Sequence, residues 1–350
     1  MYEIMTSDEA IRLIRDGDCI CVNSFVGIEN PVELHEALYR RYQKMQSPTH
    51  LTIVSSAGFG VWDTEHNAEG YIRDGAVDRL ICGHFGAMMS TKKLVLEDRF
   101  EAYNLPLGCI SHAIRAQAGG LSGALSKVGL DIFVDPRLEG PGINRVSIDD
   151  SLVKHVEVDG EEFLYYKLPK ITIALIKGTA ADHKGNITFD DMFMSGDALS
   201  ICQAVKANRG KVIVQVDRLV DTPSRPRNAI IPGCLVDAIV VAEPQERNEA
   251  YTALTGSFEI PYEEWHIWSE KIDQASEKML KDNTIGKIIG RRAAKELRVD
   301  DIVNIGIGIP EMVSRYARKS GMLDMVTLTV ESGGIGGFPV SGEAFGAMIG

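Results

Sequence analysis

A faint internal repeat constrains the fold of this chain more than any other feature of its sequence. The segment CVNSFVGIENPVEL (21–34) resembles IVNIGIGIPEMV (302–313), because each combines a strand-like run, an Asn, a Gly-containing turn, a Pro and a helix-like run. The strand-like segments that follow also align without a gap, LTIVSSAGFG (51–60) with TLTVESGGIG (327–336). Two matches in the same order predict two copies of one supersecondary unit.

Short β-branched runs separated by helical patterns predict the fold class. Strands are expected at 19–22, 51–54, 171–176, 212–216 and 238–242, and helices at 6–14 (with Ser7 as its cap), 32–42 and 285–297. Apolar runs bounded by Gly, Pro, Asp or Lys are typical of strands covered on both faces. The expected class is therefore α/β, with two similar open domains built on mostly parallel sheets.

A change of composition after residue 243 suggests the domain boundaries. We expect a first domain at 1–243, a charged connector at 244–284 and the start of a second domain at 285–350. The first copy of the repeat continues far beyond its SSAGFG strand, whereas the chain ends soon after Gly336. The second domain is therefore expected to be incomplete here, either because the chain is a fragment or because another chain completes it.

Composition argues against several classes of protein. The net charge of -12 disfavours general nucleic-acid binding, which requires a basic surface. The eight histidines show no metal-binding spacing, so no metal is expected. The six cysteines form no C-x-x-C pair and are expected to be small buried side chains. The chain lacks a signal-peptide pattern and an apolar run of about 18 residues, so we expect a cytoplasmic protein without a membrane span.

Glu331 is the residue best placed for chemistry, because it directly follows a predicted strand at 326–330. Gly333, Gly334, Gly336 and Gly337 come next and allow the backbone to bring N–H groups close to the carboxylate. Open α/β sheets bind ligands at the carboxyl ends of their strands. The pattern suits a nucleophile with oxyanion donors, and it equally suits a solvent-facing Glu beside a tight loop.

Two other loops carry weaker signals. GIGIPE (306–311) lies between a strand and a helix and suits either anion binding by backbone N–H groups or a plain turn. It is not the dinucleotide fingerprint, because Glu311 occupies the sixth position. GTAADHKGNITF (178–189) is expected to be a turn-rich excursion. No G-x-S-x-G elbow occurs, so a hydrolase triad has no support.

Taken together, these motifs resemble the family I CoA-transferases. VNIGIGIPEMV followed by TVESGGIGGFP is similar to the second half of that family, and GTAADHKGNITF, VIVQVDRLV and IIPGCLVDAIVV are similar to its first domain. ICGHFGA, NLPLGCISH and SKVGLDIFVDPRLEG resemble the single-chain propionate and acetate type. The resemblance covers essentially the whole chain and implies two similar α/β domains with the active site between them.

This resemblance implies an enzyme that moves CoA between short-chain carboxylic acids. Glu331 would attack an acyl-CoA to give an anhydride and then a glutamyl-CoA thioester. The substrates would be acyl-CoA and short-chain carboxylates, with no permanently bound cofactor, and the protein would be a homo-oligomer. The resemblance also implies oxyanion or acyl contacts at Val26, Gly27, Gly333 and Gly334, and CoA contacts at Gly306, Ile307 and Gly308.

Leu107 departs from the family pattern. Many relatives carry Gln after the Pro of the segment matching NLPLG, and Leu cannot donate a hydrogen bond. Losing one oxyanion donor can lower the rate on the order of a hundredfold. Leu107 and the incomplete second domain therefore leave open an inactive CoA-binding or regulatory subunit. An acyl-CoA hydrolase on the same scaffold, with water as the acceptor, is a separate alternative. Whether Gln117 reaches the site is also open at this point.

Overall fold

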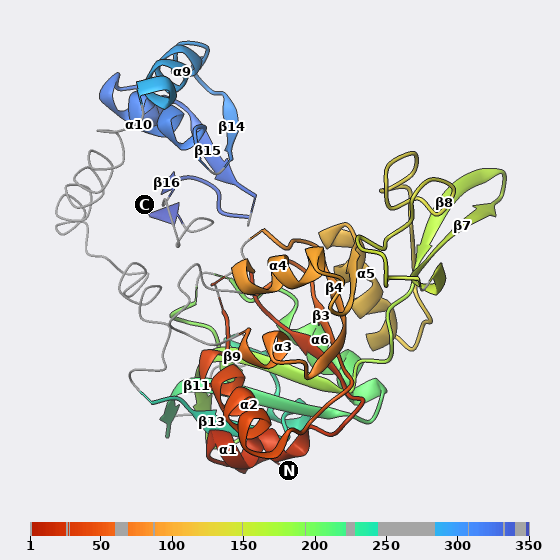
Figure 1. Cartoon of the computed structure of the whole chain (residues 1–350). Helices are drawn as coiled ribbons and strands as arrows, with labels where there is room; N and C mark the ends of the chain where they lie inside the picture. The colour runs from red at the N-terminus through yellow and green to blue at the C-terminus, as the bar shows by residue number, and fades with distance from the viewer. Residues whose placement is uncertain are drawn as a thin grey trace. The chain divides into compact units, whose positions relative to one another are not determined.

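The computed structural model describes residues 2–25, 27, 29–59, 69–86, 88–148, 150–192, 194–221, 228–243, 284–306, 308–331, 333–339 and 348–349. The chain divides into two compact units, Met1–Glu249 and Ala250–Gly350 (Figure 1). The predicted connector at 244–284 lies outside the described residues apart from Thr284, which begins a helix.

A large sheet forms the centre of the first unit. Neighbouring strands are parallel in the order β1 (Glu3–Ile4), β13 (Ala238–Val241), β11 (Lys211–Val220), β9 (Ile173–Asp182), β2 (Cys19–Val22), β3 (Leu51–Ser55), β4 (Val77–Cys82) and β5 (Glu101–Asn104). Two short strands continue from β9 in antiparallel fashion, β10 (Ile187–Thr188) and then β12 (Ala229–Ile231). The expected mostly parallel α/β class is confirmed.

The direction of strand addition reverses next to β2. The chain first moves outward from β2 through β3, β4 and β5, and later returns on the other side of β2 with β9, β11 and β13. The loops that leave the carboxyl ends of the strands therefore diverge at this point. In open α/β sheets such a switch point opens a crevice where ligands bind.

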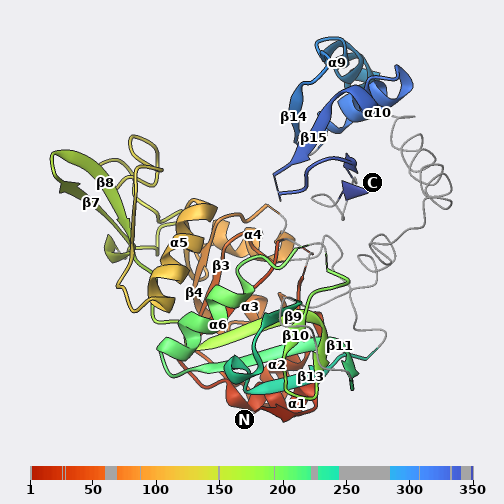
Figure 2. The same ribbon diagram turned by 180° about the vertical axis from the view of Figure 1, so that it is seen from behind.

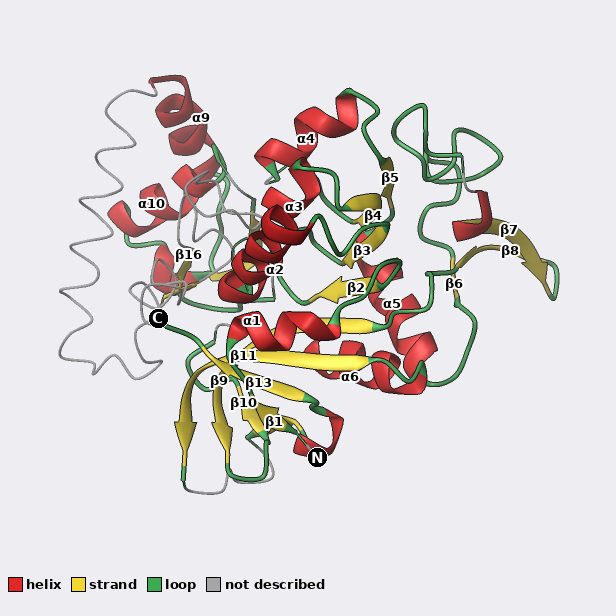
Figure 3. Ribbon diagram, turned by 60° about the horizontal axis from the view of Figure 1, so that its bottom comes forward, coloured by secondary structure: helices red, strands yellow, loops and turns green. Residues whose placement is uncertain are grey.

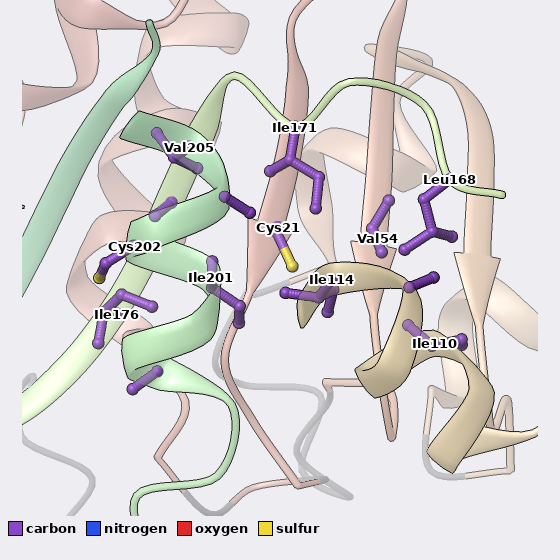
Figure 4. Close-up of a cluster of buried hydrophobic side chains, with 14 of the residues drawn as sticks. Cys21, Val54, Ile110, Ile114, Leu168, Ile171, Ile176, Ile201, Cys202 and Val205 are labelled. Carbon is purple, nitrogen blue, oxygen red and sulfur yellow. The ribbon is translucent and has the colours of Figure 1, made fainter. Parts of the chain in front are cut away.

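Helices pack on both faces of this sheet, because alternate residues of each strand point in opposite directions (Figure 3). Cys21 of β2 belongs to a core cluster with residues of α5 (Leu107–Ala118) and α6 (Ala198–Ala207), and Figure 4 shows Ile114 and Ile201 near it. Ile20 belongs to a second cluster with residues of α1 (Ser7–Ala10), α2 (Val32–Met45), α3 (Gly70–Arg73) and Val95 of α4 (Met89–Leu96). The expected helix face of Ala10, Ile11 and Ile14 is fully buried.

The structure corrects three local expectations. Thr6, and not Ser7, caps the first helix, because its hydroxyl accepts the Glu9 N–H and the Glu9 carboxylate accepts the Thr6 N–H. The segment at 178–189 begins as strand, since β9 runs to Asp182 and pairs with both β11 and β10. Cys234 is exposed in a short 3-10 turn, whereas the other five cysteines are buried as expected.

A three-stranded antiparallel sheet projects from the first unit and was not anticipated from the sequence. It contains β6 (Ala124–Ser126), β8 (Glu161–Tyr166) and β7 (Val153–Val158), and Figure 2 shows β7 and β8 standing away from the large sheet. Asp135 and Arg137 lie in the loop between β6 and β7. The Asp135 side chain is fully buried and bonds Arg137 at 2.7 Å.

The second unit has a two-stranded parallel sheet, β14 (Ile302–Ile305) with β15 (Thr327–Val330), beside α9 (Thr284–Ala294) and α10 (Glu311–Lys319). Ile305, Val313 and Leu328 form its buried cluster. A short antiparallel pair, β16 (Phe338–Pro339) with β17 (Met348–Ile349), follows. In the part of the chain that the structure describes, no helix is long and apolar enough to cross a membrane.

Both copies of the predicted repeat contain a parallel strand pair, and their registers differ from the sequence alignment. Cys21 pairs with Val54 in the first unit, whereas Ile305 pairs with Val330 in the second. Asn23 consequently follows its strand, but Asn304 lies within β14. The two asparagines that align in sequence are therefore not equivalent in structure, because the loop after β2 is longer than the loop after β14.

Candidate active site

Glu331 lies immediately after β15, and its side chain is exposed. Because Val330 pairs with Ile305, the next residues along the two neighbouring strands are Glu331 and Gly306. Glu331, the predicted nucleophile, and Gly306, the first residue of the predicted CoA-binding loop, thus lie at the same end of the β14–β15 pair. This arrangement follows from parallel pairing, which places the carboxyl ends of adjacent strands side by side.

A tight turn follows Glu331. The Gly333 N–H donates to the Val330 carbonyl at 3.0 Å, and the Val330 N–H donates to the Gly334 carbonyl at 3.1 Å. Gly333 has a φ of +101°, which side chains other than that of Gly rarely allow. Since the turn already uses the Gly333 N–H, the N–H of Gly334 is the better placed of the two predicted donors.

The loop before α10 is closed by a carboxylate of its own chain. The Gly308 N–H donates to Oε1 of Glu311 at 2.7 Å, and Glu311 is buried at the start of the helix. Carboxylates are favourable at helix N-termini, where unpaired N–H groups and the helix dipole meet. Glu311 therefore occupies an N–H group that an external anion would use, which the motif alone did not indicate.

The remaining predicted contact residues are Val26, Gly27 and Ile307. Val26 and Ile307 lie outside the described residues. Gly27 is buried in the loop after β2, in the first unit. The predicted roles of all these residues remain predictions.

A cavity of about 210 Å³ opens in the first unit at the switch point of the sheet. Its walls come from the loops after β2 and β3, from α5, and from the segment before α6. Phe25, Leu107 and Ile201 make part of the wall apolar, whereas Asn23, Glu29 and Asp197 bring polar groups to it. The cavity is small enough to suit a short acyl or carboxylate group.

Asp197 connects three sides of this cavity. Its carboxylate accepts hydrogen bonds from Ser56 Oγ at 2.8 Å and Ser111 Oγ at 2.5 Å, and Arg115 lies 3.4 Å away. The Asp197 N–H donates to Oδ1 of Asn23 at 3.0 Å. Charge-assisted hydrogen bonds of this kind hold a carboxylate in one position. Asp197 thus joins the loops after β2 and β3 to α5.

Glu29 is the second acid at the cavity, and its environment is different. It is 3% exposed, and its Oε2 accepts a hydrogen bond from Nδ2 of Asn23 at 2.6 Å. Burial raises the pKa of Glu29 to about 8, although Asn23 and Lys177 act in the opposite direction. A buried carboxyl group with a raised pKa, held at a cavity by a fixed neighbour, is typical of functional sites.

Leu107, the residue that departs from the family pattern, is the first residue of α5 and lies at the cavity, 41% exposed. Gln117 does not replace the missing amide there. Its Nε2 donates to the Leu168 and Pro169 carbonyls at the other end of α5, and its Oε1 accepts the Ile171 N–H. The amide of Gln117 therefore joins α5 to the segment that leads into β9.

Reasoning from sequence missed Asn23, Glu29, Ser111, Arg115 and Asp197 as cavity residues. Asn23 and Glu29 lie in the loop that the repeat singled out, so their position was a usable signal. Ser111 and Arg115 share one face of a helix at i and i+4 spacing, which indicates a common surface but not its function. Among the described residues, no group of three or more His, Cys, Asp or Glu side chains could hold a metal ion.

Comparison with known proteins assigns the chain to a family. The family model described as coenzyme A transferase matches residues 4–242. Acetate CoA-transferase YdiF of Escherichia coli K12 is 36% identical over 348 residues, which are 99% of this chain and 64% of that protein. Caffeate CoA-transferase of Acetobacterium woodii is 34% identical over 99% of this chain and 65% of its own length.

Solved structures agree with these matches. The crystal structure of the acyl-CoA transferase YdiF of Escherichia coli O157:H7, in a thioester complex with CoA, has a TM-score of 0.80 and 32% identity. The match covers 99% of this chain and 68% of that one. This chain therefore spans about two thirds of the length of the relatives that it matches. On its sequence and its fold, the chain belongs to the coenzyme A transferase family.

Proposed function

We propose that the natural protein containing this chain transfers CoA between short-chain carboxylic acids, with Glu331 as its nucleophile. The observation that carries the proposal is the position of Glu331 at the carboxyl end of β15, beside Gly306 and ahead of a Gly turn. The names of the relatives, acetate CoA-transferase and caffeate CoA-transferase, support the reaction class. The CoA thioester complex of a relative supports a covalent intermediate.

The proposed reaction proceeds by exchange of acyl groups at one carboxylate. The Glu331 carboxylate attacks the thioester carbonyl of acyl-CoA, which gives an acyl-glutamyl anhydride and the CoA thiolate. The thiolate then attacks the glutamyl carbonyl and releases the donor acid as its carboxylate, leaving a glutamyl-CoA thioester. An acceptor carboxylate reverses these two steps, so Glu331 is regenerated and CoA leaves on the new acid.

A carboxylate suits this chemistry because anhydride and thioester exchange reversibly. An exposed Glu at a strand end is available for attack without first losing a buried partner. The Gly334 N–H is the donor that we assign to the oxyanion that develops on the carbonyl. The cavity of about 210 Å³ in the first unit has a volume and a mixture of apolar and polar walls that suit a short carboxylate ligand.

Intact mass measurement of the whole natural protein after incubation with propionyl-CoA tests this proposal. We expect the mass of wild type to increase by one CoA less one water. Glu331→Gln keeps the size of the side chain but removes the nucleophile, and should show no such increase. Asp324→Asn is the matched control, because Asp324 is an exposed acid of the same unit and should leave adduct formation unchanged.

The same preparation separates transfer from hydrolysis. A transferase consumes acyl-CoA beyond one equivalent only when an acceptor acid is present, whereas a hydrolase consumes it with water alone. If wild type binds CoA but forms no adduct, or if Glu331→Gln forms as much adduct as wild type, the proposed nucleophile is wrong.

A further inference from the structure

The Glu29 carboxyl group is buried with one of its two oxygens unpaired. Nδ2 of Asn23 holds its Oε2, and the Met194 backbone also hydrogen-bonds the carboxyl group, whereas Oε1 is buried and is left without a partner among the described residues. Glu29 lines the cavity at the switch point of the sheet. Buried polar atoms in folded proteins are nearly always paired, so an unpaired oxygen at a cavity calls for a ligand atom or water.

The surrounding backbone holds the carboxyl group at this place. Glu29 has a φ of +56°, a conformation that side chains other than Gly, Asn and Asp adopt only when neighbouring structure holds them there. Asn23 fixes one oxygen and is itself held by the Asp197 N–H at 3.0 Å and, more weakly, by a contact to the Ser195 carbonyl at 3.4 Å. A Cβ added to Gly196 would lie 2.8 Å from Oδ1 of Asn23. The Asn23–Glu29 pair is thus enclosed on the side that faces Gly196.

The charged groups around Glu29 come from three elements. Lys177 of β9 is buried and favours the ionised form, whereas Asp197 disfavours it from the start of α6. Arg115 of α5 pairs with Asp197 across the cavity. Burial outweighs these charges and raises the pKa of Glu29 to about 8, so the carboxyl group carries a proton at neutral pH.

We propose that Glu29 is a specificity-determining hydrogen-bond donor, whose Oε1–H binds an oxygen of the carboxylate or acyl group held in the cavity. The proposal deepens the proposed function and relies on it only for the identity of the ligand as a short-chain carboxylic acid. A protonated acid can donate a hydrogen bond to a carboxylate without the cost of removing water from a Lys ammonium group. The short, directional bond also orients the ligand. An ionised Glu29 would instead repel the same ligand.

This role has a pH signature in ligand binding. If a carboxylate binds only when Glu29 is protonated, its affinity is constant below the pKa of Glu29 and falls about tenfold per pH unit above it. A site that binds anions through Lys alone would instead keep its affinity until Lys begins to deprotonate near pH 10.

Direct binding of propionate to the whole natural protein, by isothermal titration calorimetry between pH 6.5 and 9.5, tests the proposal without requiring any transfer. Wild type should lose about tenfold in affinity per unit at the upper end of this range. Glu29→Gln mimics the protonated acid, since its carbonyl accepts from Asn23 while its amide donates into the cavity. This variant should bind propionate at pH 7 within about threefold of wild type and without the fall at high pH.

Glu29→Met is the matched control, because it keeps the length of the side chain but has no donor. We expect its propionate affinity to be at least about tenfold lower at every pH, while circular dichroism at 222 nm confirms the folded state. If Glu29→Met is unfolded, Glu29→Gln alone decides the outcome.

Four results would overturn the inference. These are a flat wild-type profile, the same fall at high pH in Glu29→Gln, undetectable propionate binding by wild type, and loss of binding in a folded Glu29→Gln variant. Because propionate alone forms no CoA adduct, a normal binding profile together with no adduct from propionyl-CoA would refute the proposed function while leaving the role of Glu29 intact.

Discussion

Ser56 donates a hydrogen bond of 2.8 Å to Asp197, although 141 residues separate the two in sequence. Ser56 follows β3 and Asp197 precedes α6, so their contact joins the two sides of the switch point. The wall of the cavity therefore depends on the order of strands in the sheet. The variants below test parts of this arrangement.

Replacing Asp197 by Ala should destabilise the first unit. Ser56 and Ser111 would lose their hydrogen-bond acceptor, and Arg115 would lose its carboxylate, whereas Asn23 would keep the backbone N–H of residue 197. Leaving buried or half-buried polar groups unpaired costs about 1–3 kcal/mol. We expect the urea midpoint of the first-unit transition to fall, as followed by circular dichroism. The exposed Glu139→Ala variant should leave this midpoint in place, and an equal shift in both would contradict the assignment.

Replacing Gly196 by Ala should weaken propionate binding, whereas an equally strained substitution away from the cavity should not. Gly196 has a φ of +50°, and Gly120 has a φ of +76° with open space where a Cβ would lie. Both substitutions therefore carry backbone strain of about 1–2 kcal/mol. Only the Cβ at Gly196 would collide with Asn23. We expect propionate affinity to fall at least about tenfold in Gly196→Ala and to stay near that of wild type in Gly120→Ala, when measured by calorimetry. Equal affinities would show that Asn23 does not need this close approach.

Acid should destabilise the projecting sheet through Asp135. Hydrogen bonds from the Arg137 side chain hold the pKa of Asp135 well below its usual range, although burial acts in the opposite direction. A folded-state pKa below the unfolded value means that this stabilisation is complete above about pH 4 and is lost as pH falls through the folded pKa.

The urea midpoint of Asp135→Asn should therefore lie below that of wild type at pH 6, and the difference should shrink as pH approaches 2. Glu139→Ala again provides the control, because this neighbouring acid is exposed. A difference that stays constant with pH would mean that the charge on Asp135 contributes nothing and that its shape alone matters.

Replacing Leu107 by Gln should raise the turnover number of the natural protein. Leu107 lies at the cavity and is half-exposed at the start of α5, so a longer amide fits there without displacing the core. One added oxyanion donor is worth on the order of tenfold to a hundredfold in kcat. Leu107→Met controls for the change in shape and should leave kcat near that of wild type. If Leu107→Gln also leaves kcat unchanged, another group already supplies the donor, and Arg115 at the same cavity is a candidate.

The fold class could be predicted because the strands of the large sheet carry a local signal. Runs such as Ile213, Val214 and Val216 are apolar on both faces, which is required only where helices cover both sides of a sheet. The antiparallel sheet of β6, β7 and β8 lacked such a signal. Its exposed strands, including Glu161 and Glu162, depend on pairing with one another and on the loop that Asp135 holds.

The sequence by itself determined that this chain alternates strands with helices, that it repeats a strand–turn–helix unit, and that Glu331 follows a strand ahead of a Gly-rich turn. These features are local, because periodicity and positive φ angles are properties of neighbouring residues. Only the tertiary structure decided that Asn23, Glu29, Ser56 and Asp197 meet at one cavity. Contacts between residues so far apart depend on which strands become neighbours, and that order is set by packing of the whole sheet, which no local pattern specifies.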